Sequence, residues 1–341
     1  MAVVAAFAAA GCQVSRQSAP IGVGFLQARE VVRASDRAAL SPIAWSPDGR
    51  RFAYGARDGV WIHTVGDIKG AKIADGEVVT AVAWSRVADA IAYIDRGALW
   101  IVRPDGRGRR AIPIAGVVSR PVWAPGGDRL AVVVQPAGQN TAQLWLTGPQ
   151  GAAIRQILWD PRGRWVGALG WFPNALYLFV GLARPDADAT VEWWRVRIVY
   201  PDFRRLEGPK RPALDPMLSP SGDWIAFLAQ EDGRERAYAV RPDGSGAHPL
   251  SAPAGRAVGL GWSSSGDKVA YALAIDETRV EIRAAGASAG AQQTLATVRL
   301  ERADPRAGIS LAWSPDESHL AYGTNTGVSS GAVWLLRFAP R

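Results

Sequence analysis

One short motif recurs along this chain, and its repetition constrains the fold more than any other feature of the sequence. The first copy, IAWSPDGRRFAY, spans residues 43–54 and places an apolar run on each side of a polar turn. Seven copies align without a gap. Their anchor position, which follows the first apolar run, is occupied by Trp45, Trp84, Trp123, Trp171, Leu218, Trp262 and Trp313, at spacings of 39, 39, 48, 47, 44 and 51 residues. Such a period indicates one supersecondary unit repeated along the chain.

Each copy of the motif has the composition of a β-hairpin. Proline presets the backbone of a turn and glycine accepts positive φ, so the Ser-Pro-Asp-Gly segment predicts a turn between two strands. The second strand is apolar on both faces, with Phe52, Ala53 and Tyr54 in the first copy and alanine at the middle position in six copies. We therefore expect it to be buried on both sides, between sheets that pack face to face.

Two further strands follow in each unit. The third carries an aromatic residue in most copies, such as Trp61, Trp100 and Trp145, and a short fourth strand ends the segments 103–114 and 241–252. Four strands in every 40 to 50 residues predict an all-β fold, a seven-bladed β-propeller with four-stranded blades. In the fourth unit, Trp193 and Trp194 are adjacent, so we expect them on opposite faces of the sheet, with one in the core.

The two ends of the repeat region predict how the ring closes. The sequence ends at Arg341, directly after the third strand of the seventh copy, so this blade lacks an outer strand. A strand-like run, residues 24–34, precedes the first copy. We expect this N-terminal strand to complete the last blade, so that residues 24–341 form a single seven-bladed propeller.

The first residues resemble a bacterial lipoprotein signal. Residues 2–10 are small or apolar and lead to Gly11 and Cys12, the one cysteine of the chain. The apolar run is too short to span a bilayer. The resemblance implies lipidation at Cys12, with residues 1–12 as the signal-like segment and residues 13–23 as a tether. The competing interpretation is a buried cysteine, because no lysine or arginine precedes the apolar run.

The charge of the chain does not indicate a nucleic-acid partner. The net charge is +8, and the arginines are scattered rather than gathered into a basic run interleaved with aromatic residues. We interpret them as a solvated surface and expect no binding of nucleic acid.

The residues that could carry chemistry are isolated in the sequence. The three histidines share no motif, Ser288 of the GASAG segment lies in a small-residue loop without a following helix pattern, and each turn aspartate stands alone. We therefore predict no catalytic residue, no metal and no cofactor. The histidines are His63, His248 and His319, and the turn aspartates are Asp48, Asp105, Asp243 and Asp316.

The connections between the second and third strands differ most between units. They are minimal in the first two units and longer in segments 135–143, 183–192, 273–279 and 324–332. All of these connections leave the ring on one face, and insertions confined to one face of a repeat protein often mark the binding face. Variation of surface loops without function is the alternative.

The repeated motif resembles the WD40-like Pro-Asp repeat of TolB-type propellers, most closely at residues 43–54, 216–252 and 311–322. Repeats 2 and 4 depart from it, since Arg86 replaces the turn proline and Phe-Pro-Asn replaces Ser-Pro-Asp-Gly. TolB is a periplasmic protein-binding component. The resemblance, with the lipoprotein-like start, implies a non-enzymatic, monomeric propeller anchored in a bacterial cell envelope that binds a protein or cell-wall partner.

Two other function classes stay open at this point. A propeller enzyme, such as a lactonase or lyase, would need carboxylates, histidines or a metal in its central channel. A ligand-sensing module would need an aromatic-lined pocket at the mouth of that channel.

Overall fold

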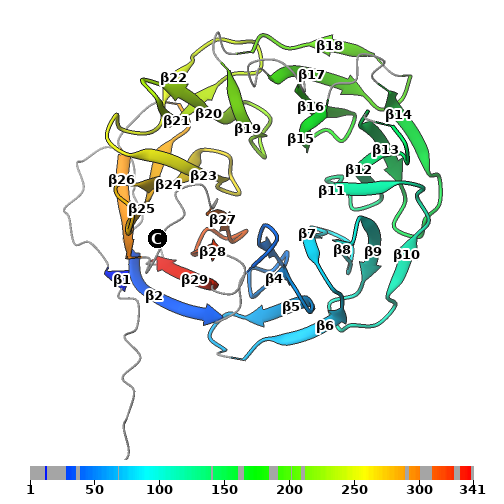
Figure 1. Cartoon of the computed structure of the whole chain (residues 1–341), viewed down its shortest axis with the longest axis horizontal. Helices are drawn as coiled ribbons and strands as arrows, with labels where there is room; N and C mark the ends of the chain where they lie inside the picture. Colours follow the sequence, from blue (N-terminus) through cyan, green and yellow to red (C-terminus); the bar gives the residue numbers. More distant parts are fainter. Residues whose placement is uncertain are drawn as a thin grey trace, which may run out of the picture.

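Seven β-sheets stand around a central axis like the blades of a propeller (Figure 1), as the repeat predicts. The computed structural model describes residues 12–13, 28–35, 39–67, 69–139, 141–159, 165–183, 191–200, 202–208, 212–288, 292–299, 309–325 and 331–338. In this part of the chain the regular structure is all β. No helix among these residues is long and apolar enough to cross a membrane.

Each blade is an antiparallel sheet whose first strand lies nearest the axis, and in the first five blades the other strands follow outward in chain order. Blade 1 contains β3 (Ala44–Trp45), β4 (Arg51–Ala56), β5 (Gly59–Thr64) and β6 (Ala71–Asp75). Blade 2 contains β7 (Val79–Trp84), β8 (Ile91–Asp95), β9 (Ala98–Val102) and β10 (Arg110–Ile112). Blade 3 contains β11 (Val117–Trp123), β12 (Leu130–Gln135), β13 (Gln143–Thr147) and β14 (Arg155–Trp159). Blade 4 contains β15 (Trp165–Trp171), β16 (Tyr177–Ala183), β17 (Val191–Arg197) and β18 (Phe203–Arg205). Blade 5 contains β19 (Ala213–Leu218), β20 (Ile225–Glu231), β21 (Arg234–Val240) and β22 (His248–Pro249).

The last two blades include strands from the N-terminal end of the chain, which lie outermost. Blade 6 contains β23 (Arg256–Trp262), β24 (Lys268–Ala274), β25 (Arg279–Gly286), β26 (Gln292–Arg299) and, as a fifth strand, β1 (Cys12–Gln13). Blade 7 contains β27 (Ser310–Trp313), β28 (His319–Asn325), β29 (Gly331–Phe338) and β2 (Ala28–Ser35). The pairing of β2 with β29 confirms that an N-terminal strand completes the last blade.

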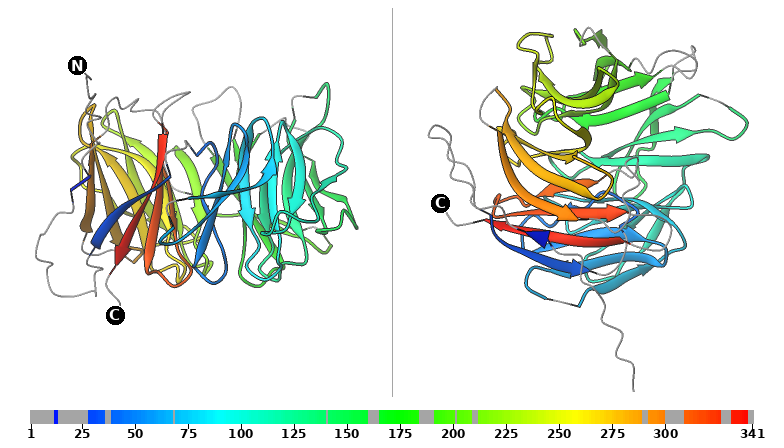
Figure 2. Two further views of the ribbon diagram at one scale, coloured as in Figure 1. Left: turned by 90° about the horizontal axis from the view of Figure 1, so that it is seen from below. Right: turned by 60° about the vertical axis from the view of Figure 1, so that its left-hand side comes forward.

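The strands run between two faces of the ring (Figure 2). We call the face with the seven motif turns, and with the connections from third to fourth strands, the turn face. The opposite face carries the connections from second to third strands and those between blades, and we call it the loop face. These names follow from the antiparallel order of each sheet.

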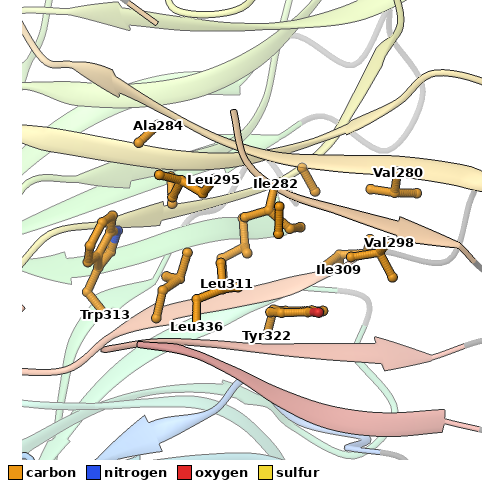
Figure 3. Packing of buried hydrophobic residues seen from close by; sticks show 14 of the residues in the cluster. Val280, Ile282, Ala284, Leu295, Val298, Ile309, Leu311, Trp313, Tyr322 and Leu336 are labelled. Atoms are coloured by element: carbon orange, nitrogen blue, oxygen red, sulfur yellow. The ribbon is translucent and has the colours of Figure 1, made fainter. Parts of the chain in front are cut away.

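The core lies between neighbouring blades. Tyr54, Tyr93, Tyr271 and Tyr322 of the second strands have no exposed surface, as expected for strands buried on both faces. Figure 3 shows one such interface, in which Ile282 and Leu295 of blade 6 meet Leu311, Tyr322 and Leu336 of blade 7. In blade 4, Trp193 is buried against Phe179 and Phe227, whereas Trp194 is half-buried.

Six of the motif turns are closed by a backbone hydrogen bond from the fourth residue to the carbonyl of the first, whereas in blade 2 Ala88 N donates to Ser85 Oγ at 2.9 Å. In blade 3, Gly127 N donates to the Ala124 carbonyl at 2.9 Å, and Gly127 has φ +68°. A Cβ at this position would lie 2.9 Å from Ser85 Oγ of blade 2, so glycine also allows adjacent turns to pack closely. Blades 4 and 7 place Ala175 and Glu317 at the corresponding positive φ.

Candidate binding face

The seven anchor residues occupy equivalent positions in the fold, because each is the last residue of an innermost strand. Four of the tryptophans also join blades, since each Nε1 donates to the carbonyl of the residue before the anchor of the preceding blade. These bonds run from Trp45 to Ala312, from Trp123 to Ala83, from Trp171 to Val122 and from Trp262 to Met217, at 2.9–3.0 Å. Leu218 has no such donor. Among the described residues, Trp313 Nε1 has no hydrogen-bond acceptor.

Cys12, the predicted lipidation site, lies in β1 on the outer edge of blade 6. Its backbone is paired with Val298, and Gln13, the first residue of the predicted tether, is paired with Thr297. The rest of the predicted signal-like segment and tether, 1–11 and 14–23, falls outside the described residues. Val298 is the penultimate residue of β26, at the end that leads to the loop face. Cys12 therefore lies beside the loop-face end of its sheet.

The three histidines lie in three different blades. His63 is buried in β5 of blade 1, where its Nε2 is 3.2 Å from Tyr54 Oη, which in turn is 2.8 Å from Ser35 Oγ of β2. His248 is in β22 and His319 begins β28. Within the ranges that the structure describes, three or more potential metal ligands do not gather anywhere. His63 therefore helps join blade 1 to the closing strand of blade 7.

The turn aspartates bind their own turns. Asp48 Oδ1 accepts hydrogen bonds from Ser46 Oγ at 2.6 Å and from Arg50 N at 3.1 Å, and these bonds lower the pKa of its carboxyl group. Asp243 and Asp316 accept equivalent bonds from Ser245 and Ser318, and Asp105 accepts one from Arg107 N. Ser288 is exposed in the turn that follows β25, and its surroundings are a β-hairpin rather than a strand–turn–helix.

The loop face is elaborated in some blades and minimal in others. Blades 1, 2 and 5 connect their second and third strands through two residues, whereas blade 3 uses residues 136–142 and blade 6 uses residues 275–278. The longer connections 184–190 and 326–330 of blades 4 and 7 lie outside the described residues. Among the described connections, those of blades 3 and 6 are therefore longer than those of blades 1, 2 and 5.

The blade 3 connection is held by a network of side-chain amides. The Gln139 carbonyl accepts from Gln135 Nε2 at 3.3 Å, and Gln139 Oε1 accepts from Thr141 Oγ1 at 3.3 Å and from Gln143 Nε2 at 3.5 Å. Gln143 Oε1 in turn accepts from Trp145 Nε1 at 2.9 Å. Gln139 is exposed. The loop therefore presents uncharged amide groups, which recognise peptide backbones and sugar hydroxyls by hydrogen bonding.

An exposed apolar side chain lies beside this network. Val117 begins the innermost strand of the same blade, is paired with Gln135 and is 58% exposed. Thus the loop-face end of blade 3 combines amide groups with an apolar contact. The glutamine composition of segment 135–143 was a sequence signal for this network, but the bonds depend on how the loop folds back.

Two innermost strands carry charged residues that are held in an unusual backbone conformation. Arg120 of β11 and Asp215 of β19 have φ +50° and +46° at bulges in their strands, and each precedes a proline. Both residues are exposed, and both lie on innermost strands, which are the strands nearest the central axis (Figure 1). Neither residue was predicted from the sequence, because a bulge is not visible in the repeat.

Known proteins match this chain only by structure, since neither a known family nor a curated protein matches the sequence. An oligogalacturonate lyase in complex with manganese is 12% identical, with a TM-score of 0.67 over 92% of this chain and 96% of that one. A putative TolB from Agrobacterium tumefaciens is 17% identical, with a TM-score of 0.56 over 90% and 99%. TolB from Acinetobacter baumannii is 14% identical, with a TM-score of 0.55 over 78% and 64%. At these identities the likeness defines the class of fold, a β-propeller shared with TolB and with lyases.

Proposed function

We propose that this protein is a non-enzymatic propeller, anchored outside the cytoplasm by lipid at Cys12, that binds a protein or a cell-wall component on its loop face. The observation that carries the proposal is the amide network of Gln135, Gln139 and Gln143 on an elaborated connection. A preorganised polar loop on a rigid scaffold is typical of a recognition site. The fold shared with TolB supports a binding role, and the position of Cys12 near the loop face supports an anchor there.

The binding part is tested with point variants of blade 3. Gln139→Ala removes the side-chain acceptor of Thr141 and Gln143, and Gln135→Ala removes the donor to the main-chain carbonyl of Gln139. Gln150→Ala is the matched control, because Gln150 is an exposed glutamine on the turn face of the same blade. We expect the first two variants to lose capture of solubilised envelope proteins or sedimentation with purified cell wall. Retention of both activities by Gln139→Ala and Gln135→Ala contradicts the proposed site.

The anchoring part is tested independently by intact-protein mass and membrane fractionation. We expect diacylglyceryl mass on Cys12 and release of a Cys12→Ala variant from the membrane. An unmodified, soluble wild type contradicts the anchor but leaves the binding test unaffected.

A channel enzyme is the second candidate, and Arg120 and Asp215 are the observation in its favour. The similar lyase is named for oligogalacturonate, an anionic sugar chain that an arginine on an innermost strand could attract. The test is formation of unsaturated product from oligogalacturonate with manganese present. Turnover by the wild type that is lost in Asp215→Asn would contradict the binding proposal and support a channel enzyme. We expect no turnover.

A further inference from the structure

Four exposed apolar side chains gather on the turn face of blade 4. Leu176 is 50% exposed, Val199 43%, Tyr200 83% and Phe203 40%. They are neighbours in the fold, because Ile198 N donates to the Leu176 carbonyl at 3.1 Å and Phe203 is paired with Val196. We name this set the blade 4 patch. We propose that it is a docking surface for an acidic segment of a partner protein that carries apolar side chains.

The patch results from changes in two separate turns of one blade. The motif turn has Phe172, Asn174 and Ala175 where the repeat has serine, aspartate and glycine, and Leu176 follows. The connection from third to fourth strand contains Val199 and Tyr200, whereas blade 5 has Arg-Pro-Asp-Gly at residues 241–244. The other large apolar side chains exposed in the described residues are scattered over different strands and turns: Val32, Val78, Val87, Val117 and Met217. Contiguous exposed apolar side chains indicate an interaction site, whereas single ones do not.

The turn that carries Tyr200 has a defined backbone conformation. The φ of Tyr200 is +52°, a left-handed value that costs a non-glycine residue about 1 kcal/mol. The turn is closed by the bond from Arg197 N to the Asp202 carbonyl at 2.9 Å. From blade 3, Arg155 Nη2 donates to the Ile198 carbonyl at 2.8 Å. Tyrosine is a frequent centre of protein interfaces, and a hydrogen-bonded turn loses little backbone entropy on binding.

The charges around the patch favour an acidic partner. Four exposed arginines lie in the strands that carry the patch or in β14 of the adjacent blade, namely Arg155, Arg197, Arg204 and Arg205. The exposed carboxylates of the same segment are those of Asp202 and Glu207. A second copy of this chain would bring two such arginine sets together, and like charges disfavour that contact. An anionic membrane would also attract arginines. However, the proposed anchor at Cys12 lies beside the loop face, so the blade 4 patch on the opposite face of the ring would point away from that membrane. This one argument depends on the proposed function.

The docking surface is tested with the full-length Cys12→Ala chain, so that the result does not depend on lipidation. The probe is a fluorescent synthetic peptide of about ten residues that alternates glutamate with leucine and phenylalanine. A second peptide replaces each glutamate with lysine. We expect the acidic peptide to bind and to protect residues 172–177 and 197–205 from hydrogen exchange, and the basic peptide to leave them unprotected.

Variants then show which residues of the patch contribute to binding of the acidic peptide. We expect Tyr200→Ser and Leu176→Ser to weaken binding of the acidic peptide at least tenfold. Val87→Ser is the matched control, because Val87 is a 68% exposed apolar residue in the blade 2 turn on the same face, and it should leave binding unchanged. Unchanged circular dichroism and melting temperature show that each variant folds.

Several results would overturn the proposal. One is that the acidic peptide fails to bind, another is that the basic peptide binds equally well, and a third is that hydrogen exchange shows protection in other blades instead of blade 4. Dimerisation that is abolished by Tyr200→Ser would assign the patch to a second copy. Binding of phosphatidylglycerol vesicles by wild type and its loss in Tyr200→Ser would assign it to a membrane.

Discussion

At the scale of single residues, the left-handed turn position shows how a side chain can offset backbone strain. Glu317 occupies this position in blade 7 with φ +56°. Its carboxylate accepts from Lys268 Nζ at 2.8 Å and from Ser265 N at 3.0 Å, both in blade 6. Lys268 is 5% exposed in its side chain and is also paired with Asp267 at 2.7 Å. Glu317 therefore satisfies a buried ammonium group that needs a partner. Ala175, at φ +55°, cannot form such a bond, because its side chain is a methyl group.

Replacing these two residues with glycine should have opposite effects. Ala175→Gly relieves a left-handed alanine, so we expect the free energy of unfolding to rise by about 0.5–1 kcal/mol. Glu317→Gly relieves similar strain but removes a partner of Lys268, so we expect a loss of about 2 kcal/mol. Urea denaturation measures both. A lower free energy of unfolding for Ala175→Gly would show that the left-handed backbone at this turn does not destabilise the protein.

His319 should make stability dependent on pH. Burial lowers its pKa from the ordinary value near 6.5, and the neighbouring Asp316 carboxylate partly opposes this effect. The unfolded chain therefore binds a proton more readily than the folded one, so stability is complete above about pH 6.5 and falls as the pH decreases below it. We expect His319→Gln to flatten the dependence between pH 8 and 5, measured by urea denaturation. Identical slopes for variant and wild type would exclude this histidine as the cause.

At the scale of elements, the anchor tryptophans hold one blade to the next. Trp123 donates its indole proton to Ala83 of blade 2, whereas Trp313 has no acceptor for its indole among the described residues. The two side chains have the same position in their blades and similar burial, at 8% and 5% exposed. They therefore form a pair that differs in the indole hydrogen bond and in the stacking of Trp313 on Phe338, whose ring centroids are 5.3 Å apart.

This pair predicts unequal costs for the same substitution. Trp123→Phe leaves the Ala83 carbonyl without its donor, whereas Trp313→Phe removes a buried donor that had no acceptor. We expect Trp123→Phe to be more destabilising by about 1 kcal/mol, in urea denaturation at neutral pH. Equal losses in the free energy of unfolding would indicate that packing alone determines how much an anchor tryptophan stabilises the fold.

The sequence predicts elements far better than contacts between them. The hairpins, the seven blades and the closing strand follow from local patterns, and the structure confirms them. The indole bonds were not predictable, because their acceptors are carbonyls of another blade. The β1–β26 pair and the amide network of Gln139 depend equally on how separate segments meet in space. The blade 4 patch was visible only as a degenerate repeat, since exposure is a property of the folded ring.

At the scale of the whole molecule, one strand closes the ring. Pairing of β2 with β29 extends from Ala28–Phe338 to Ser35–Val333, and Ser35 continues into blade 1 through Tyr54 and His63. Blade 7 thus depends on both ends of the chain. The β1 pair adds a separate and much shorter contact.

Truncations should separate the two N-terminal strands. A variant lacking residues 1–27 loses β1 but keeps β2, and we expect its melting temperature to stay within about 4 °C of wild type. A variant lacking residues 1–38 also loses β2, opens the ring and exposes the edge of β29. We expect it to melt at least roughly 10 °C lower or to aggregate, because several kcal/mol are lost in a domain of this size. Differential scanning calorimetry measures both, and equal melting of the two variants would show that closure by β2 is dispensable.

The pairing of β2 with β29 also imposes an order in time. During synthesis, β2 emerges long before its partner β29, so β2 has no native neighbour until the innermost strands of all seven blades have been made. Contacts between such distant segments form slowly, because the connecting chain must be ordered before they contribute stability. A ring that cannot close early is completed late in folding. The architecture that seals the finished ring therefore also postpones its completion until the strands of the last blade are available.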